Sequence, residues 1–292
     1  SAIAHGDRAQ KQCDNTLVAR GQQILDDLKA TDGYAVVLAS RPYQNDDLVN
    51  HELPSFFTEL GIPVLTVDSV PGICDVDLHN SRLDVVNNFH ARMLSSAIWA
   101  AQSKQLEYVQ IVSFGCGHDA YLSDEIIRMM SEISESVPLV LKVDESDVQG
   151  PLRIRVRSFI ETVAMRRRLD RAVPVRTLED SYPVKYQASD RQDKVVLVPN
   201  TSHAFCRLLS AAFVKQGVRA EPLDVGREEA IRLGKKYVHN DICFPAQIVI
   251  GEALAALESG RYDNEHIAIG TGKYIGDCRL THYAALLRKA LD

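Results

Sequence analysis

The sequence lacks the features that would place it in several large classes of protein. No run approaches the ~20 consecutive apolar residues that a membrane-spanning helix needs, and residues 1–10 contain neither the apolar core nor the cleavage pattern of a signal peptide. Positive charge is not in excess, because 33 Lys and Arg oppose 39 Asp and Glu for a formal net charge of −6. The sequence therefore predicts a soluble, cytoplasmic protein that binds neither nucleic acid nor membrane.

Several catalytic signatures are also missing. The chain has no G-x-S-x-G, no H-E-x-x-H and no C-x-x-C, so nothing indicates a hydrolase, a zincin, a thioredoxin-like protein or a zinc ribbon. Six cysteines without a secretory signal are not expected to form a disulfide framework. They are core residues, metal ligands or reactive thiols, and their positions in the fold must decide which.

The sequence does contain an alternation of strand-like and helix-like segments, which is typical of a parallel sheet covered by helices. Seven apolar runs predict strands, at residues 34–39, 64–67, 108–114, 138–143, 194–199, 219–223 and 266–270. Apolar side chains at helical spacing predict helices through residues 86–101, 122–133, 152–171, 202–216, 246–258 and 280–291. The predicted fold class is α/β.

The length of 292 residues suits two units with separate cores. Residues 174–193 are polar, contain two prolines and interrupt the alternation. We therefore predict an N-terminal α/β subdomain over residues 1–173, a crossover over 174–193 and a C-terminal α/β subdomain over 194–292. Each is expected to be a small open parallel sheet of the flavodoxin or Rossmann type, with a cleft between the two.

Three cysteines follow predicted strands or precede predicted helices, which is where α/β sheets bind ligands. Cys116 lies in Gly115-Cys116-Gly117-His118-Asp119 after a strand, and Cys278 follows a strand and a glycine-rich loop. Cys243 comes directly before Phe244-Pro245 at the start of a helix, where the helix dipole favours the thiolate that binds metal. The positions indicate a shared metal site, although a free cysteine is also commonly a small buried hydrophobe.

The other three cysteines have simpler interpretations. Cys206 stands between apolar residues of a predicted helix and is expected in the core. Cys74 lies in a predicted turn and is expected to be structural. Cys13 is expected to lie in a frayed N-terminus.

At these same segments the chain resembles the 2-hydroxyacyl-CoA dehydratase superfamily. The resemblance is to the region that accompanies the ATPase modules in CoA-substrate-specific enzyme activase-related proteins of anaerobes. It is carried in order by Arg41-Pro42-Tyr43 with Asn50-His51, Val64-Leu65-Thr66-Val67-Asp68-Ser69, Ser113-Phe114-Gly115-Cys116-Gly117-His118-Asp119-Ala120, Asp144-Glu145, Gly150 with Arg153-Ile154-Arg155-Val156-Arg157-Ser158, Asn240-Asp241-Ile242-Cys243-Phe244-Pro245-Ala246, and Cys278-Arg279 with Tyr283.

The resemblance implies a low-potential iron–sulfur protein. Cys116, Cys243 and Cys278 match the family's cysteines and would hold a [4Fe–4S] or double-cubane cluster, which an ATP-dependent activator module reduces. An acyl-CoA substrate and a homodimer are further implications. His118 and Asp119, beside Cys116, are candidates to deliver a proton to a leaving hydroxide, and Asp119 is equally a candidate helix cap.

Two further features leave alternatives open. Gln44, Asp277 and His282 depart from the family's usual residues, which favours the alternative of a cluster-free domain that binds an acyl-CoA or a partner. A cluster of arginines has two interpretations. It binds the phosphates of CoA or an acidic partner, or it forms a solvated helix face. They are Arg153, Arg155, Arg157, Arg166, Arg167, Arg168 and Arg171.

Overall fold

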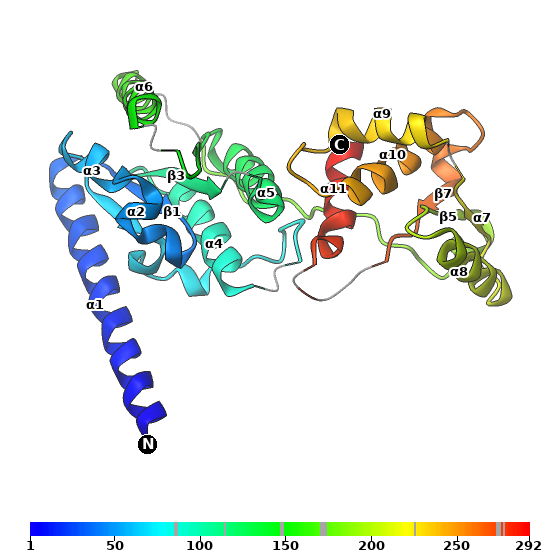
Figure 1. Ribbon diagram of the computed structural model, residues 1–292, viewed down its shortest axis with the longest axis horizontal. Coiled ribbons are helices and arrows are strands. Elements are labelled where there is room, and N and C mark those ends of the chain that lie inside the picture. Colours follow the sequence, from blue (N-terminus) through cyan, green and yellow to red (C-terminus); the bar gives the residue numbers. More distant parts are fainter. Residues whose placement is uncertain are drawn as a thin grey trace. The chain divides into compact units, whose positions relative to one another are not determined.

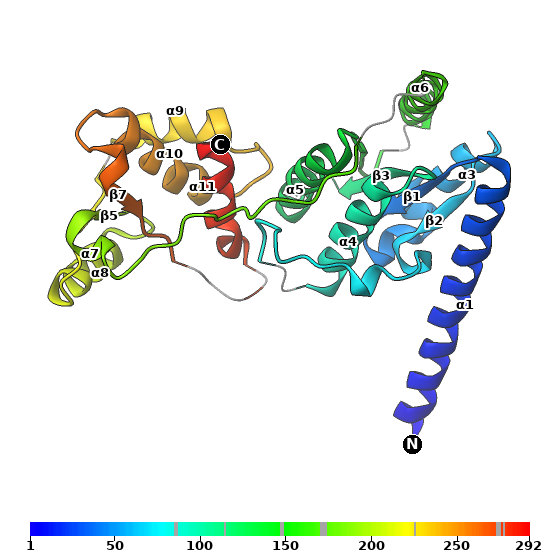
Figure 2. The same ribbon diagram turned by 180° about the vertical axis from the view of Figure 1, so that it is seen from behind.

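The computed structural model describes residues 1–84, 87–113, 115–146, 149–169, 174–224, 226–272, 276 and 278–292. These residues form two compact units (Figures 1 and 2). Unit 1 takes the described residues of Ser1–Asn80, Asn87–Phe114 and Leu122–Glu179, and unit 2 takes those of Ser81–Val86, Gly115–Tyr121 and Asp180–Asp292. The chain therefore passes into unit 2 twice before its C-terminal third is reached.

Unit 1 contains a four-stranded parallel sheet in the order β2-β1-β3-β4. The strands are β1 (Ala35–Ala39), β2 (Val64–Thr66), β3 (Leu106–Ser113) and β4 (Leu139–Val143). All five residues of β1 are buried, as expected for a central parallel strand that is covered on both faces. The order reverses between β1 and β3, so this sheet has a topological switch point there.

Helices cover both faces of this sheet. On one face, Val36 and Leu38 of β1 join a core with Phe56 of α3 and Val156 of α6. On the other face, the hydroxyl of Tyr108 in β3 donates to the carbonyl of Met93 in α4 over 2.8 Å. The helices that begin in this part of the chain are α1 (Ala2–Thr31), α2 (Asp47–Asn50), α3 (Leu53–Thr58), α4 (Asn88–Gln102), α5 (Gly117–Ser134) and α6 (Gln149–Arg168).

Only the C-terminal part of α1, from Gly21 onward, packs against the rest of unit 1. Its buried residues are Gly21, Leu25 and Leu28, and a methyl group on Gly21 would lie 1.8 Å from the carbonyl oxygen of Ser69. Cys13 lies in the exposed middle of this 30-residue helix. The prediction of a frayed terminus at Cys13 was therefore wrong, because the residues around it continue a regular helix that the docked end anchors.

Unit 2 contains a three-stranded parallel sheet in the order β6-β5-β7. Its strands are β5 (Val195–Val198), β6 (Ala220–Pro222) and β7 (Ile267–Ile269). α8 (His203–Lys215) packs on one face through Cys206 and Phe213, and α10 (Phe244–Glu258) reaches the other face at Ala256. The remaining helices are α7 (Asp190–Asp193), α9 (Arg227–Tyr237) and α11 (Tyr283–Leu291).

α9 and α10 cross at very short range because glycines stand at the crossing. A methyl group on Gly251 would lie 1.8 Å from the carbonyl oxygen of Ala230, and one on Gly234 would lie 1.9 Å from that of Gln247. The crossing belongs to a buried cluster that also contains Tyr121, Ile242 and Tyr283. It therefore fixes the start of α10, where Cys243 lies.

The two-sheet α/β fold predicted from the sequence is confirmed, and each of the seven predicted strands occurs. The crossover is mainly irregular between residues 174 and 189 and ends in the short helix α7. Within the described residues, no helix combines the length and apolar character that crossing a bilayer demands. Val86, Phe114, Arg171 and part of the glycine-rich loop, residues 273–275 and 277, lie outside the described residues.

Candidate functional site

The three cysteines singled out from the sequence all lie in unit 2. Cys116 comes directly before α5, Cys243 is the N-cap of α10, and Cys278 is the N-cap of the short 3-10 helix η5 (Arg279–His282) that leads into α11. Cys116 and Cys243 are partly buried, and Cys278 is exposed. Each thiol thus stands at the start of a helical segment of the same unit.

Two tyrosines surround the thiol of Cys243. Its Sγ is 3.1 Å from the hydroxyl of Tyr283, which is buried. Burial raises the pKa of Tyr283, with further contributions from Cys243 and Cys278, while Arg279 acts in the opposite direction. Burial likewise raises the pKa of Tyr121, with contributions from Cys243 and Tyr283. Both phenols therefore stay protonated near neutral pH and can donate hydrogen bonds to a sulfur atom.

Arg279 joins the segment of Cys278 to the segment of Cys116. Its guanidinium group lies so close to Gly117 that a methyl group there would be 2.8 Å from it. Its backbone carbonyl accepts a hydrogen bond from the hydroxyl of Tyr121 over 3.3 Å. These contacts tie the first turn of α5 to η5. They explain why a glycine follows Cys116: a side chain would displace the guanidinium.

Two histidines extend the cluster on the same side of α5. The ring of His282 lies 4.9 Å from that of Tyr121 and 6.5 Å from that of His118. Burial, together with the charge of His118, lowers the pKa of His282 to about 4, and Asp84 offsets this in part. Asp119, the other candidate proton donor, is buried in the first turn of α5.

The described residues do not contain a preassembled metal centre. Among them, no three His, Cys, Asp or Glu side chains converge as the ligands of one metal ion would. The three thiols are thus gathered in one unit and tied to one cluster of Tyr121, Tyr283, Arg279 and His282, without meeting at a single point.

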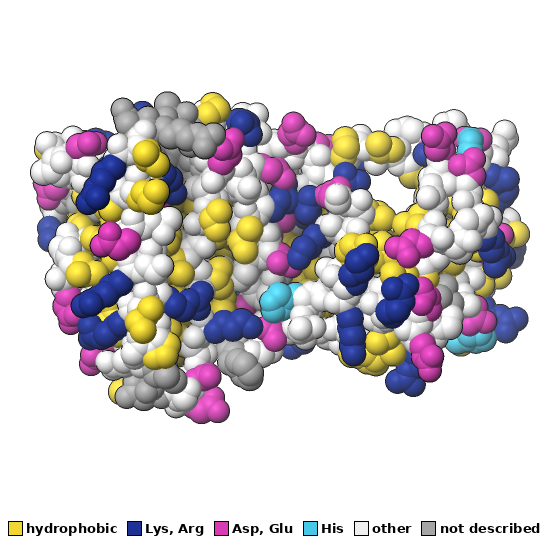
Figure 3. All heavy atoms as spheres, turned by 90° about the horizontal axis from the view of Figure 1, so that it is seen from above, with side chains coloured by type: hydrophobic (Ala, Val, Ile, Leu, Met, Phe, Trp, Pro, Cys, Tyr) yellow, Lys and Arg dark blue, Asp and Glu magenta, His cyan; other side chains and the backbone are white. Residues whose placement is uncertain are grey.

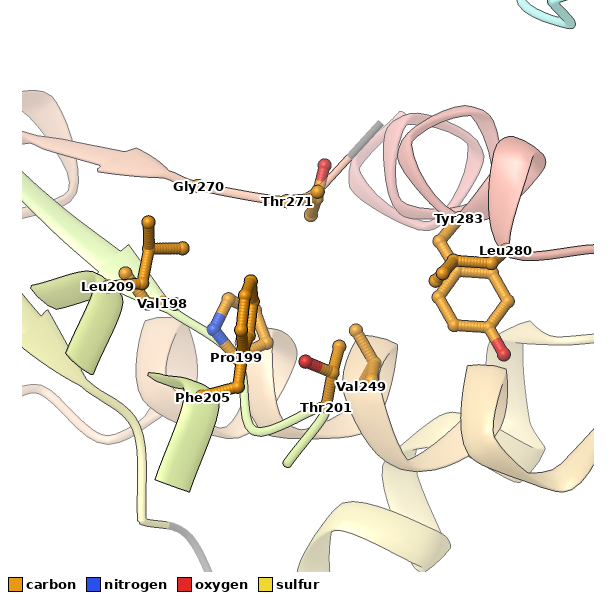
Figure 4. A pocket seen from close by; sticks show the side chains of 11 residues that line it. Val198, Pro199, Thr201, Phe205, Leu209, Val249, Gly270, Thr271, Leu280 and Tyr283 are labelled. Carbon is orange, nitrogen blue, oxygen red and sulfur yellow. The ribbon is translucent and has the colours of Figure 1, made fainter. Parts of the chain in front are cut away.

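A small apolar pocket lies next to this cluster at the switch point of the unit 2 sheet (Figure 4). It opens beyond the carboxyl ends of β5 and β7, between Pro199 and Thr201 on one side and Gly270 and Thr271 on the other. Leu280 and Tyr283 line its far end. Its cavity volume of about 10 Å³ corresponds to roughly one water molecule, so it offers no room for an acyl chain in this conformation.

The arginines of α6 mostly hold that helix on unit 1. Arg155 donates to the carbonyl of Val140 over 2.7 Å, and Arg153 pairs with Glu59 at 2.8 Å. Arg166 pairs with Glu107, and Arg167 donates to the carbonyl of Lys104. Ile154, Met165 and Leu169 are exposed, and hydrophobic and basic side chains lie side by side on the surface that Figure 3 shows. Four arginines thus have intramolecular partners, which does not favour a CoA-phosphate clamp.

The remaining sequence-predicted residues fall in simpler places. Cys206 is buried, and its thiol donates to the carbonyl of Pro199 over 3.0 Å, so the core prediction is confirmed. Cys74 is exposed in a short 3-10 helix. In unit 1, Gln44 stands in the 3-10 helix η1 (Pro42–Asn45) after β1 and donates to the hydroxyl of Ser113 at the end of β3 over 3.0 Å.

Sequence reasoning did not identify Tyr121 as part of the site. Its only signal is its position four residues after Gly117, which places both on one face of α5. That signal has no meaning until η5 is known to pack there.

Comparison with known proteins gives one finding. No curated protein and no solved structure matches the chain. Residues 1–70 match the family model described as "CoA enzyme activase uncharacterised domain". The matched stretch contains α1, β1 and β2, with η1, α2 and α3 between the two strands, and it ends before Cys116. Through its first 70 residues the chain is therefore related to the CoA enzyme activase proteins.

Proposed function

We propose that the chain is an iron–sulfur-binding redox module of a CoA enzyme activase-type system, which accepts or relays low-potential electrons. Its cluster, a [4Fe–4S] or double-cubane centre, would be held by Cys116, Cys243 and Cys278. An ATP-dependent activator module is the proposed electron donor, and an acyl-CoA the proposed substrate of the whole system.

The observation that supports the proposal is the junction around Arg279. The segments that carry Cys116 and Cys278 touch there through Gly117, and Tyr121 from the first segment lies beside Cys243. Three thiolates are the usual donor set for a cubane that keeps one open iron. Because no three donors converge among the described residues, the proposal requires the thiols to move closer together on binding.

When bound, the cluster would supply a one-electron carrier of low potential. The protein's own contribution would be to orient the thiols and to restrict water. Tyr283 already contacts the thiol of Cys243 at 3.1 Å, and a hydroxyl donor beside a cluster sulfur tunes its potential. The lack of a side chain on Gly117 lets Arg279 cross the first turn of α5. His118, in the same turn, would be positioned to transfer a proton.

The test is iron and acid-labile sulfide content after reconstitution of the full chain without oxygen. We expect about four of each per chain and loss of most iron in Cys116→Ser, Cys243→Ser and Cys278→Ser. Cys13→Ser and Cys74→Ser are matched controls, because these two cysteines form no disulfide and are exposed. Absence of iron from the wild-type chain would overturn the proposal and leave a cluster-free binding domain as the interpretation.

A further inference from the structure

The outer face of α6 carries apolar and basic side chains that are exposed to solvent. It consists of Ile154, Arg157, Met165, Arg168 and, just beyond the end of the helix, Leu169. In chain order, its three apolar residues are 70%, 64% and 68% exposed. The amide of Leu169 donates to the carbonyl of Met165 over 3.1 Å, so the helical course continues to this residue. Because three turns take about 11 residues, Ile154 and Met165 lie on one side of the helix, and the apolar stripe is roughly 22 Å long.

The arginines of α6 divide into two groups. The helix contains six arginines and a single carboxylate, that of Glu161. Four of the arginines hold the helix on unit 1 through the contacts described above. Arg157 and Arg168 are exposed, and neither forms a hydrogen bond or an ion pair with another residue that the structure describes. The packing of unit 1 therefore does not account for these two guanidinium groups.

The two remaining arginines follow the apolar residues at a fixed spacing. Arg157 comes three residues after Ile154, and Arg168 comes three residues after Met165. Residues three apart are neighbours on a helix surface, so the outer face carries two apolar–basic pairs that are three turns apart. Single exposed apolar residues are ordinary, whereas an apolar stripe beside charged residues is typical of an interaction site, and Met and Arg are enriched in protein–protein interfaces.

A shallow hollow lies beside the first of these pairs. It is a cavity of about 20 Å³ between α3 and α6, and its lining includes Phe56, Leu60 and Arg157. Leu60 is itself 46% exposed. The volume suffices for about one water-sized group, such as a methyl group of a side chain that packs against the helix. The surface is thus shaped to receive a side chain at the end where Arg157 lies.

The number of unpaired charges limits the class of partner. A nucleic-acid site often neutralises about 6–10 phosphates, and an anionic membrane site takes about 4–8 Lys or Arg, whereas this face offers two. A second copy of α6 would oppose like charges across the contact. Two positive charges in register with an apolar stripe suit a protein helix whose carboxylates lie beside its own apolar stripe.

We propose that the outer face of α6 binds an amphipathic helix of a partner protein. The apolar stripe of that helix would pack on Ile154, Met165 and Leu169, and its carboxylates would pair with Arg157 and Arg168. Bidentate pairing of each guanidinium group would fix the register of the two helices. This inference goes beyond the redox function, because the surface requires neither the cysteines nor a cluster.

The test measures binding of the full chain to stapled helical peptides by fluorescence anisotropy. The first peptide is about 20 residues long, which covers the stripe. It carries two leucines at the spacing of Ile154 and Met165, each followed by a glutamate at the spacing of the arginines. A second peptide has lysine in place of both glutamates. We expect the acidic peptide to bind at least about tenfold more tightly than the basic one, and the difference to decrease as salt screens the charges.

Charge reversal locates the binding site. In the double variant Arg157→Glu with Arg168→Glu, the preference should reverse, so that the basic peptide binds more tightly. The matched control is Arg207→Glu with Arg227→Glu, which makes the same change of charge at two exposed arginines of unit 2. The control should keep the preference of wild type. All four arginines are exposed, so neither double variant should disturb folding.

The apolar contribution is tested by Ile154→Ser with Met165→Ser, which should weaken binding of the acidic peptide at least about tenfold. Equal binding of the two peptides by wild type, loss of the preference in the control, or unchanged binding without the two apolar side chains would overturn the inference. A dimer that Arg157→Glu with Arg168→Glu converts to monomer in analytical ultracentrifugation would also overturn it, with a second copy as the occupant. Comparable binding to phosphatidylserine vesicles, abolished by the same variant, would overturn it in favour of a membrane surface.

Discussion

The close crossing of α9 and α10 yields a sharp prediction, since it fixes the N-cap position of Cys243. The perturbation is Gly251→Ala. Its methyl carbon would lie 1.8 Å from the carbonyl oxygen of Ala230 and 2.8 Å from the backbone nitrogen of Gly234, whereas ordinary contacts begin at 3.4 Å. Both atoms belong to backbone, so no side chain can rotate away and the helices must move apart.

The magnitude follows from two opposing terms. Overpacking in a tight core costs about 1–3 kcal/mol, occasionally more, and an overlap with backbone belongs at the upper end. Replacing a helical glycine by alanine returns about 1 kcal/mol of helix propensity. We therefore expect Gly251→Ala to lower the free energy of unfolding of unit 2 by about 2 kcal/mol or more. The control is Gly6→Ala in α1, where nothing lies within 4 Å of the added methyl group.

The assay is urea unfolding followed by circular dichroism at a helical band, with tryptophan fluorescence as an internal comparison. Trp99, the single tryptophan, lies in α4 of unit 1. The dichroism midpoint should fall in Gly251→Ala more than the fluorescence midpoint, and Gly6→Ala should be neutral or slightly stabilising. If Gly251→Ala were as stable as wild type, the helices would not cross as closely as described, and the geometry around Cys243 would need revision.

Three further predictions concern buried polar groups. Burial lowers the pKa of His282 from 6.5 to about 4. Below about pH 6.5 the unfolded chain therefore binds a proton at this imidazole that the folded chain does not, and the free energy of unfolding decreases as the pH falls toward 4. His282→Asn should remove up to about 3 kcal/mol of this acid-induced loss, measured by urea unfolding at pH 7 and pH 4.5. Arg128 pairs with Glu125, which is 4% exposed. Arg128→Met should cost about 3 kcal/mol, because it removes the guanidinium that compensates this buried carboxylate. Adding Glu125→Gln should recover part of this loss, and no recovery would contradict the reasoning. Gln110 is fully buried in β3, with neither amide atom hydrogen-bonded among the described residues, so Gln110→Met should raise the free energy of unfolding by about 1 kcal/mol; a thermal midpoint below wild type would show that the amide has a partner after all.

The central strands could be predicted because they are short, largely apolar runs that are buried on both faces. β1 is a continuous apolar segment and β3 is buried over seven of its eight residues, and a parallel sheet requires no long-range information to produce that pattern. α9 was not predicted, although it is an 11-residue helix. Only Ala230, Leu233 and Gly234 of α9 are buried, and two of these are too small to give a hydrophobic period.

The arginines of α6 show a different limit. Their spacing indicated a basic face, but whether such a face meets solvent, a ligand or the protein's own carbonyl groups depends on what packs beneath the helix. The structure gives Arg155 and Arg167 backbone carbonyl partners from β4 and from the turn before β3. These contacts join residues far apart in sequence, and no local pattern specifies them.

The sequence by itself determined the class of fold, the burial of Cys206 and the placement of Cys116, Cys243 and Cys278 beside helix starts, because each of these follows from hydrophobic periodicity over a few neighbouring residues. Only the tertiary structure decided that the segment of Cys116 packs into unit 2, that Tyr121 lies beside Cys243, and that Nδ1 of His282 is buried without a partner. The contact of Tyr121 with Arg279 spans 158 residues. Such contacts depend on how whole elements pack, and the local sequence around either residue does not indicate its partner.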